Sequence, residues 1–574
     1  MTFKKIALYY NTLKHLRRRQ ISYRLWYFLR NRWRKLSGFK YDFEKTGPLS
    51  IKLFLEPSIA APTSFSKENG FTLLNLTQKF IENIDWEFAD FGKLWTYNLT
   101  YFDFLNQNTV DTEGSSDVRF GMSNVSSTTS EIKNQIAEIK IKFNFAPIID
   151  DFIEKLPTLK NALEPFPIAL RGINWVKFFA QNNIQNPIYD RSLFHQYQIL
   201  NDNIEYHLLG NHLLENGFSM LFGAVYFQNK DFWQTANRIL TEELEEQILA
   251  DGAHFELCPM YHKIMLFRTL DCYNLLINNN LQIKNTPSVF DTQNVVLTKL
   301  LADKAAKMLG WLENMTYADG TTPNFGDSTE GIAPTSAELF DYAERLKIQP
   351  LPHPLSDSGF RKLKNQNFEI TAKVGKIGPD YIPGHAHADS LSFELRIKDQ
   401  PIFVDMGIST YETNARRQLE RSTSSHNTVE IAGKNSSEVW GSFRVGKRAN
   451  GKILKDTPTH LIAQHDGYKN LNINHLREFQ LEENTVKITD KTNNNTTSKA
   501  YFYASPTLSL QLDNNSVTFK NGKIDFFINE KDNALIEKVE LAAYSLPPQY
   551  NTFLTAQKVV VTFKGTLYTH IQAI

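Results

Sequence analysis

The spacing of apolar residues changes part-way along this chain, and that change constrains the fold more than any other feature. From Phe71 to about Leu346, apolar residues recur every three or four positions, as in amphipathic helices. From Phe360 onward, they alternate with polar residues in short runs separated by Asn, Gly and Asp, as in antiparallel strands. The sequence therefore predicts an α+β multidomain protein, with a boundary in the stretch that contains Pro350, Pro352, Pro354 and Gly359.

The helical part contains several long periodic segments that predict stacked antiparallel helix pairs, as in a solenoid or a closed ring. These segments are 148–163, 167–181, 201–227, 231–249, 260–281 and 295–315. We expect a basic N-terminal helix over 1–45, a helical domain over 46–350 and a β-sandwich over 351–574. A stretch rich in Ser, Thr, Asn and Gly, at about 108–130, predicts a flexible surface insertion.

Composition excludes several classes of protein. The 574 residues carry 63 Lys and Arg against 62 Asp and Glu, which argues against a nucleic-acid partner held by a global positive field. The chain has two cysteines, Cys258 and Cys272, so a disulfide framework is excluded, and we expect buried thiols.

The first 40 residues are rich in both Arg and aromatic residues. Their apolar runs are too short and too interrupted for a signal peptide or a membrane span, so we expect a cytoplasmic protein rather than a periplasmic one. A basic amphipathic helix can lie on an anionic membrane surface, peripheral to the inner membrane, or pack on the main domain. The sequence favours docking on the domain and leaves contact with the membrane open.

Histidines gather at the predicted starts of strands. His385 and His387 lie two residues apart before an alternating run, where they share one face and can reach one site. Asp405 ends an apolar run, and His426 opens another strand. Two His and one Asp at strand ends are ligands that suit zinc, although surface-loop histidines are an equal alternative.

Two helical segments carry polar residues that need explanation. Asn211 and Glu215 share a helix face, and His212 neighbours Glu215. Polar groups in an otherwise apolar helix are costly to bury unless they are satisfied, so a structural hydrogen-bond cluster is the first interpretation. Tyr261 lies near the start of another helix, where half-buried packing is the usual role.

An ordered set of motifs resembles the heparinase II/III-like polysaccharide lyases. Besides the histidine segments, the set includes Leu94–Leu99, Arg171–Trp175, Gly210–Asn216 and Pro323–Ser328. The resemblance spans about Leu94 to Thr428 and implies an N-terminal incomplete (α/α) toroid followed by an antiparallel β-sandwich.

The resemblance also implies roles for residues of this chain. Asn211 would neutralise a uronate carboxylate, Tyr261 would act as the acid and, as in some members of the family, also as the base, and His385 would be the second proton-transfer residue. His212 and Glu215 would position the substrate. An unperturbed Tyr has a pKa of about 10, so Tyr261 suits proton donation, whereas action as a base needs nearby positive charge.

Further assignments concern the metal and the substrate. By resemblance, His387, Asp405 and His426 would bind Zn²⁺ in a mainly structural role. The acidic polysaccharide would be contacted by Trp95, Arg421 and Asn427. Arg421 suits this role because guanidinium groups bind carboxylates bidentately. Solvated surface charge is the alternative for Arg421, and positioning of His426 is the alternative for Asn427.

We therefore expect a lyase that cleaves a uronate-containing glycan by β-elimination, in bacterial capsule or exopolysaccharide metabolism. One alternative is a non-catalytic glycan-binding or assembly-scaffold protein. A glycoside hydrolase would need paired carboxylates, for which Glu215 and Asp327 are candidates, but the histidine motifs fit that chemistry poorly.

Overall fold

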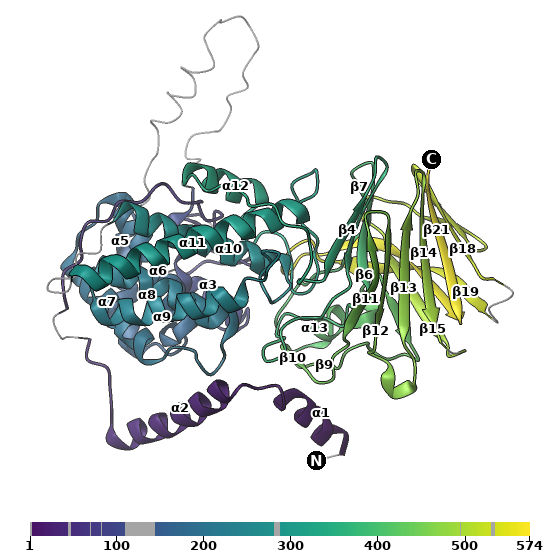
Figure 1. Ribbon diagram of the computed structural model, residues 1–574. Coiled ribbons are helices and arrows are strands. Elements are labelled where there is room, and N and C mark those ends of the chain that lie inside the picture. The colour runs from purple at the N-terminus through teal and green to yellow at the C-terminus, as the bar shows by residue number, and fades with distance from the viewer. Residues whose placement is uncertain are drawn as a thin grey trace, which may run out of the picture.

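The structure, a computed structural model, describes residues 3–43, 47–68, 70–81, 83–108, 144–279, 287–493, 495–529 and 534–574. Figure 1 shows a helical domain beside a sheet-rich domain, with the two N-terminal helices along one side of both. The expected insertion at about 108–130 lies, apart from its first residue, outside the described residues.

The helical domain forms an incomplete (α/α) toroid. Consecutive helices pack on one another, with α8 in contact with α6, α7, α9 and α10. Its helices are α3 (Lys93–Tyr101), α5 (Ala146–Lys155), α6 (Pro165–Asn182), α7 (Pro187–Asp202), α8 (Gly210–Tyr226), α9 (Lys230–Gln247), α10 (Pro259–Asn278), α11 (Pro287–Met315) and α12 (Ser336–Arg345). A small sheet of β1 (Phe65–Ser66), β2 (Gly70–Leu73) and β3 (Leu76–Gln78) precedes them.

The start of α8 corrects a prediction and determines how the site is built. The periodic segment 201–227 is not one helix, because Leu209 has a φ of 65° and the helix begins only at Gly210. Asn211 and His212 therefore lie in the first turn of α8 instead of mid-helix. In a first turn, backbone N–H groups have no partner within the helix and can bind other groups.

The sheet-rich domain is an antiparallel β-sandwich, as the alternating runs predicted. Every strand ladder in its described part is antiparallel. An eight-stranded sheet consists of β11 (Gly451–Thr457), β12 (His460–His465), β13 (His475–Leu481), β14 (Thr485–Thr492), β21 (Thr566–Ala573), β18 (Gly522–Phe527), β17 (Ser516–Phe519) and β16 (Gln511–Asp513).

Two four-stranded sheets complete the sandwich. One consists of β4 (Phe360–Lys364), β5 (Phe368–Lys373), β6 (Ser392–Ile397) and β7 (Gln400–Phe403). The other consists of β19 (Leu535–Leu546), β20 (Leu554–Lys564), β15 (Ser498–Tyr503) and β8 (Val429–Ile431). A hairpin of β9 (Val439–Trp440) and β10 (Arg444–Val445) and the short helix α13 (Ala415–Glu420) lie beside them.

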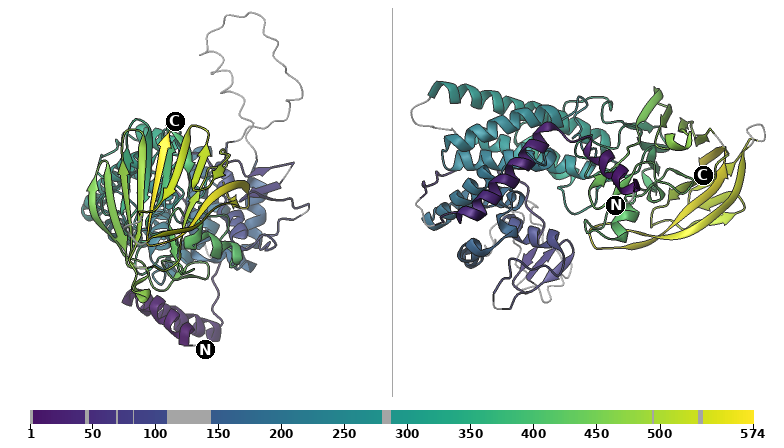
Figure 2. Two further views of the ribbon diagram at one scale, coloured as in Figure 1. Left: turned by 90° about the vertical axis from the view of Figure 1, so that its right-hand side faces the viewer. Right: turned by 90° about the horizontal axis from the view of Figure 1, so that it is seen from below.

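The N-terminal helices dock on the body of the protein, as the sequence favoured. The right-hand view of Figure 2, seen from below, shows α2 (Arg18–Ser37) over the helical domain and α1 (Phe3–Leu13) toward the sandwich. Arg17, just before α2, donates to Glu246 of the helical domain at 2.7 Å. The Trp440 indole donates to Thr12 of α1 at 3.1 Å. Both cysteines are free and buried, as predicted.

Asp251 fastens the link between the two domains. Its Oδ2 atom accepts from the Ser356 N–H at 2.9 Å, the Ser358 N–H at 3.1 Å and the Ser358 hydroxyl at 2.6 Å. Asp251 and Ser358 are buried, so the two Ser358 donors have little access to water, and the Ser356 N–H is partly buried. One carboxylate oxygen thus satisfies a segment that would otherwise be costly to bury.

We predict that Asp251→Ala lowers the free energy of unfolding by about 2–4 kcal/mol, because it leaves these donors buried and unpaired. Asp303→Ala is the control, since Asp303 makes an exposed ion pair with Lys299 and should change stability by less than about 0.5 kcal/mol. Urea denaturation of both variants checks this. Equal stability of the two would contradict the assigned role of Asp251.

Candidate active site

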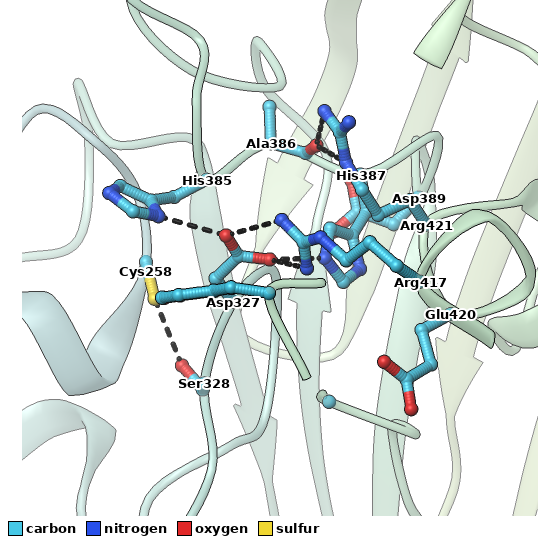
Figure 3. A network of polar contacts seen from close by, with 12 residues as sticks. Cys258, Asp327, Ser328, His385, Ala386, His387, Asp389, Arg417, Glu420 and Arg421 are labelled. Atoms are coloured by element: carbon cyan, nitrogen blue, oxygen red, sulfur yellow. Dashed lines mark hydrogen bonds and ion pairs between the residues drawn. The ribbon is translucent and has the colours of Figure 1, made fainter. Parts of the chain in front are cut away.

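A buried carboxylate, Asp327, connects the residues of the site (Figure 3). Arg417 of α13 donates to it through both terminal nitrogens, Nη1 to Oδ1 at 2.5 Å and Nη2 to Oδ2 at 2.7 Å. His385 and His387 bond the same carboxylate, each at 2.8 Å. Burial alone would raise the pKa of Asp327, but Arg417 and the histidines hold it well below its usual range. Asp327 is therefore a fixed negative charge.

His385 is oriented by this charge. Its Nδ1 donates to Asp327 Oδ2, so in the neutral form of the imidazole the lone pair lies on the other ring nitrogen, Nε2. Nε2 lies 3.3 Å from Asn211 Nδ2 and 3.5 Å from Glu256 Oε2. The side chain retains 11% exposure, so it can meet a ligand. The arrangement is that of a general base whose tautomer is set by a carboxylate behind it.

The helical domain meets His385 from two sides. The Tyr261 ring, in the first turn of α10, stacks on the imidazole with 3.8 Å between ring centroids and 26° between planes. Asn211, in the first turn of α8, faces Nε2, and its backbone N–H donates to Glu256 Oε1 at 3.1 Å. The two helix N-termini and the loop between β5 and β6 thus meet at one point.

Burial sets the protonation of the neighbouring acids. It raises the pKa of Tyr261 well above its usual value of about 10, although a hydrogen bond of 3.0 Å between the hydroxyls of Tyr261 and Tyr411 acts in the opposite direction. Tyr261 is therefore a phenol, and not a phenolate, at neutral pH. Burial also raises the pKa of Glu256, which favours its protonated form.

His212 is partly exposed, whereas Glu215 is buried. The His212 side chain is 36% exposed, and its Nδ1 lies 3.2 Å from Glu205 Oε1. Burial lowers the pKa of His212, but Glu205 outweighs this and raises it overall. Glu215 is buried, with Oε2 3.4 Å from Arg268 Nε. Its carboxylate therefore faces Arg268 and not solvent.

The three expected metal ligands lie close together but do not form a complete site. His426 Nδ1 donates to Asp405 Oδ2 at 2.9 Å, and the ring centroids of His387 and His426 are 5.2 Å apart. The described residues contain no group of three or more His, Cys, Asp or Glu arranged to hold a metal ion. Nevertheless, His387 Nδ1 and His426 Nε2 are buried without a hydrogen-bond partner, as imidazole nitrogens reserved for a metal would be.

Three predicted substrate contacts are wrong, because these side chains are fully buried and bonded within the protein. Trp95 is 0% exposed and its indole donates to the Leu76 carbonyl at 3.0 Å. Arg421 is 0% exposed and donates to the carbonyls of Ala386, Gly441 and Arg444. Asn427 is 0% exposed and bridges three backbone groups. Each is bonded within the protein fold.

Sequence patterns from known families match most of this chain. The heparinase II/III N-terminal pattern covers residues 185–349, and the heparinase II/III-like C-terminal pattern covers residues 348–573. Together they cover the second half of the helical domain, the sandwich and the site residues from Asn211 to His426. The chain belongs to the heparinase II/III-like family.

Curated relatives carry the same name in three bacteria. The chain is 26% identical over 296 residues to a heparin-sulfate lyase of Bacteroides stercoris, an alignment that covers 46% of this chain and 41% of the relative. It is 26% identical over 257 residues to a heparin-sulfate lyase of Pedobacter heparinus, covering 39% and 36%. The matched region therefore spans about two fifths of the length of these relatives.

Solved structures support the heparinase-like fold. A heparinase III structure matches with a TM-score of 0.62 at 18% identity, covering 87% of this chain and 80% of that chain. The heparan sulfate lyase HepC from Pedobacter heparinus matches with a TM-score of 0.51 at 18% identity, covering 94% and 86%. At these identities the likeness concerns the fold.

Sequence reasoning missed three contributors to this heparinase-like site. Glu256 lies in a loop with no recognisable pattern, and Tyr411 reaches Tyr261 from a distant loop. Arg417 is fully buried on Asp327, a role that its place in the sequence does not indicate. The bonds of the two candidate carboxylates argue against a glycoside hydrolase. Asp327 is bonded to Arg417 and two histidines, and Glu215 is paired with Arg268.

We predict that Asp327→Asn destabilises the protein by about 3–5 kcal/mol at pH 7, because Arg417 is left buried without its countercharge. The pKa of Asp327 is depressed by folding, so its contribution is complete above the unfolded value of about 3.9 and is lost as pH falls below that value. Urea denaturation from pH 7 to pH 3 checks this. A stability difference that stays constant across this range would contradict the prediction.

Proposed function

We propose that this protein is a polysaccharide lyase that cleaves a uronate-containing glycan by β-elimination. The observation that carries the proposal is the stack of Tyr261 on His385, because it places a protonated phenol beside an imidazole whose Nδ1 is bonded to Asp327. β-Elimination needs both an acid for the leaving oxygen and a base for the C5 proton. The heparin-sulfate lyases among the relatives support this assignment.

His385 is the base in this mechanism. Its Nε2 lone pair removes the proton at C5 of the uronate, and the Asp327 carboxylate stabilises the imidazolium that results. Because Asp327 already holds its charge through Arg417, the proton stays on the imidazole. The C5–H electron pair then forms the C4–C5 double bond as the C4–O bond breaks.

Tyr261 donates its proton to the glycosidic oxygen that leaves C4. Its raised pKa makes it the acid of the pair and a poor base at neutral pH. Asn211 lies where a uronate carboxylate would approach the base, and Glu256 beside it is protonated more readily because it is buried. The Asn211 amide can donate to the uronate carboxylate, and the raised pKa of Glu256 lessens charge repulsion beside it, which favours loss of the C5 proton.

We further propose a substrate of low sulfation, such as a bacterial capsule or exopolysaccharide made by the cell itself. Arg417 and Arg421 are fully buried and bonded to Asp327 and to backbone carbonyls, so they do not offer their charge to sulfate groups. The setting we propose is the cytoplasmic face of the inner membrane.

We also propose that Zn²⁺ is bound by His387, Asp405 and His426 in a structural role. The two unpartnered imidazole nitrogens support this, and neutral imidazole with carboxylate is a donor set that suits zinc. When bound, the ion would tie together the loops that carry these residues and so stiffen the segment around His385. Asp405 now bonds His426 and would exchange that contact for the metal.

Ultraviolet absorbance of the unsaturated uronate product tests the activity. Wild-type protein is incubated with a panel of uronate glycans beside Tyr261→Phe, His385→Ala and the control Tyr273→Phe, which changes another tyrosine on α10. We expect the first two variants to lower kcat by about 10²–10⁴-fold and the control to retain full activity. Full activity in Tyr261→Phe and His385→Ala would refute the mechanism. No product from any glycan would favour the scaffold alternative.

Elemental analysis of purified protein tests the metal. We predict about one zinc per chain in the wild type and a large loss of zinc in His387→Ala and His426→Ala, with a lower unfolding temperature. His460→Ala, on β12 outside the site, is the control and should keep its zinc. Wild-type protein that holds no zinc after growth in zinc-supplemented medium would contradict the proposal.

A further inference from the structure

Helix α2 docks on the protein through its polar side. The residues that face inward recur at helical spacing, namely Gln20, Tyr23, Tyr27, Arg30 and Arg34. Gln20 is buried and donates to the Leu208 carbonyl at 3.0 Å, and Arg34 donates to Asp202 at 2.5 Å. This is the reverse of the usual arrangement, in which a surface helix turns its apolar side toward the protein.

The apolar side of α2 faces away from the protein. Seven large apolar side chains are between 52% and 81% exposed, namely Ile21, Leu25, Trp26, Phe28, Leu29, Trp33 and Leu36. At 100° per residue they fall on one half of the helix, opposite the docked residues. Ile6, Tyr10 and Leu13 of α1 are also 50% to 67% exposed and share one face. We call these residues the outer face. A contiguous exposed apolar surface of this kind marks an interaction site.

The charge around the outer face is of one sign. Neither α1 nor α2 contains Asp or Glu. Arg30 and Arg34 are used for docking, but Arg18, Arg32 and Lys35 are exposed beside the apolar side chains. In a dimer formed through this face, these cations would lie against the same cations of the second copy and repel them. An anionic partner is favoured instead, because it would neutralise them.

A pocket at the C-terminal end of α1 is a second cationic feature. It is lined by Lys14 and His15 and by Lys447, Arg448 and Lys469 of the sandwich, with Asp380 and Asp466 also present. The Arg448 atoms Nε and Nη1 are buried and bond none of the described residues. Unpartnered guanidinium nitrogens in such a pocket are suited to a phosphate oxygen.

We propose that the outer face of α1 and α2 binds the surface of an anionic lipid bilayer. The helices lie in the plane of the interface, with Trp26 and Trp33 at the level of the headgroups and the apolar side chains just below. At about 30 Å long, α2 contacts the bilayer along its whole length, while its polar side holds the protein. None of the described helices is long and apolar enough to cross a membrane. This proposal stands apart from the lyase activity.

Vesicle flotation of the full chain tests it. We expect binding to vesicles of phosphatidylcholine with phosphatidylglycerol, little binding to phosphatidylcholine alone, and weaker binding at high salt. The double variant Leu29→Ser/Trp33→Ser should lose binding by about tenfold or more, since it removes two of the largest exposed apolar groups. The matched control Leu535→Ser/Phe553→Ser changes apolar residues of similar exposure on the sandwich and should bind like the wild type.

Three results would overturn the proposal. The first is the absence of binding to anionic vesicles, and the second is binding that Leu29→Ser/Trp33→Ser leaves unchanged. The third is a dimer that dissociates in that variant, as measured by light scattering, because it would show that a second copy covers the outer face. Far-ultraviolet circular dichroism and the unfolding temperature confirm that both double variants are folded.

Discussion

The buried carboxylate of Asp327 is the interaction on which the site depends. It accepts two bonds from Arg417 and one each from His385 and His387, and all four groups have little or no contact with water. A charge in such a place is tolerated only when it is fully paired. The pairing therefore fixes α13 and the histidine loop against the segment that follows α11, so that one set of bonds both joins the domains and orients the base.

The site separates an acid from a base by environment, without needing unusual residue types. Tyr261 and His385 lie in contact, yet burial keeps the phenol protonated while the carboxylate behind the imidazole supplies a basic lone pair. In the proposed mechanism, the acid comes from the helical domain and the base from the sandwich. Under that proposal neither domain alone would be competent for elimination, and the link at Asp251 would bear on function as well as on stability.

The sequence predicted the architecture and much of the proposed chemistry, because periodicity and residue type are local properties. It placed Asn211, Tyr261 and His385 in one site only through resemblance to a family. The sequence did not predict the burial of Trp95, Arg421 and Asn427. The residue type alone does not show whether an aromatic, cationic or amide side chain lies on a surface or bonds buried backbone groups. Glu256, Tyr411 and Arg417 were missed because their roles arise from contacts between segments far apart in the chain.

The central claim is that His385 removes the C5 proton while Tyr261 protonates the leaving oxygen. The crystal structure of Tyr261→Phe with a bound uronate oligosaccharide tests it most directly, because this variant should bind substrate without cleaving it. The account predicts that the C5 carbon lies next to His385 Nε2, the carboxylate next to Asn211, and the glycosidic oxygen next to the ring of residue 261. A sugar bound with its C5 hydrogen directed away from His385, or bound elsewhere on the protein, would contradict it.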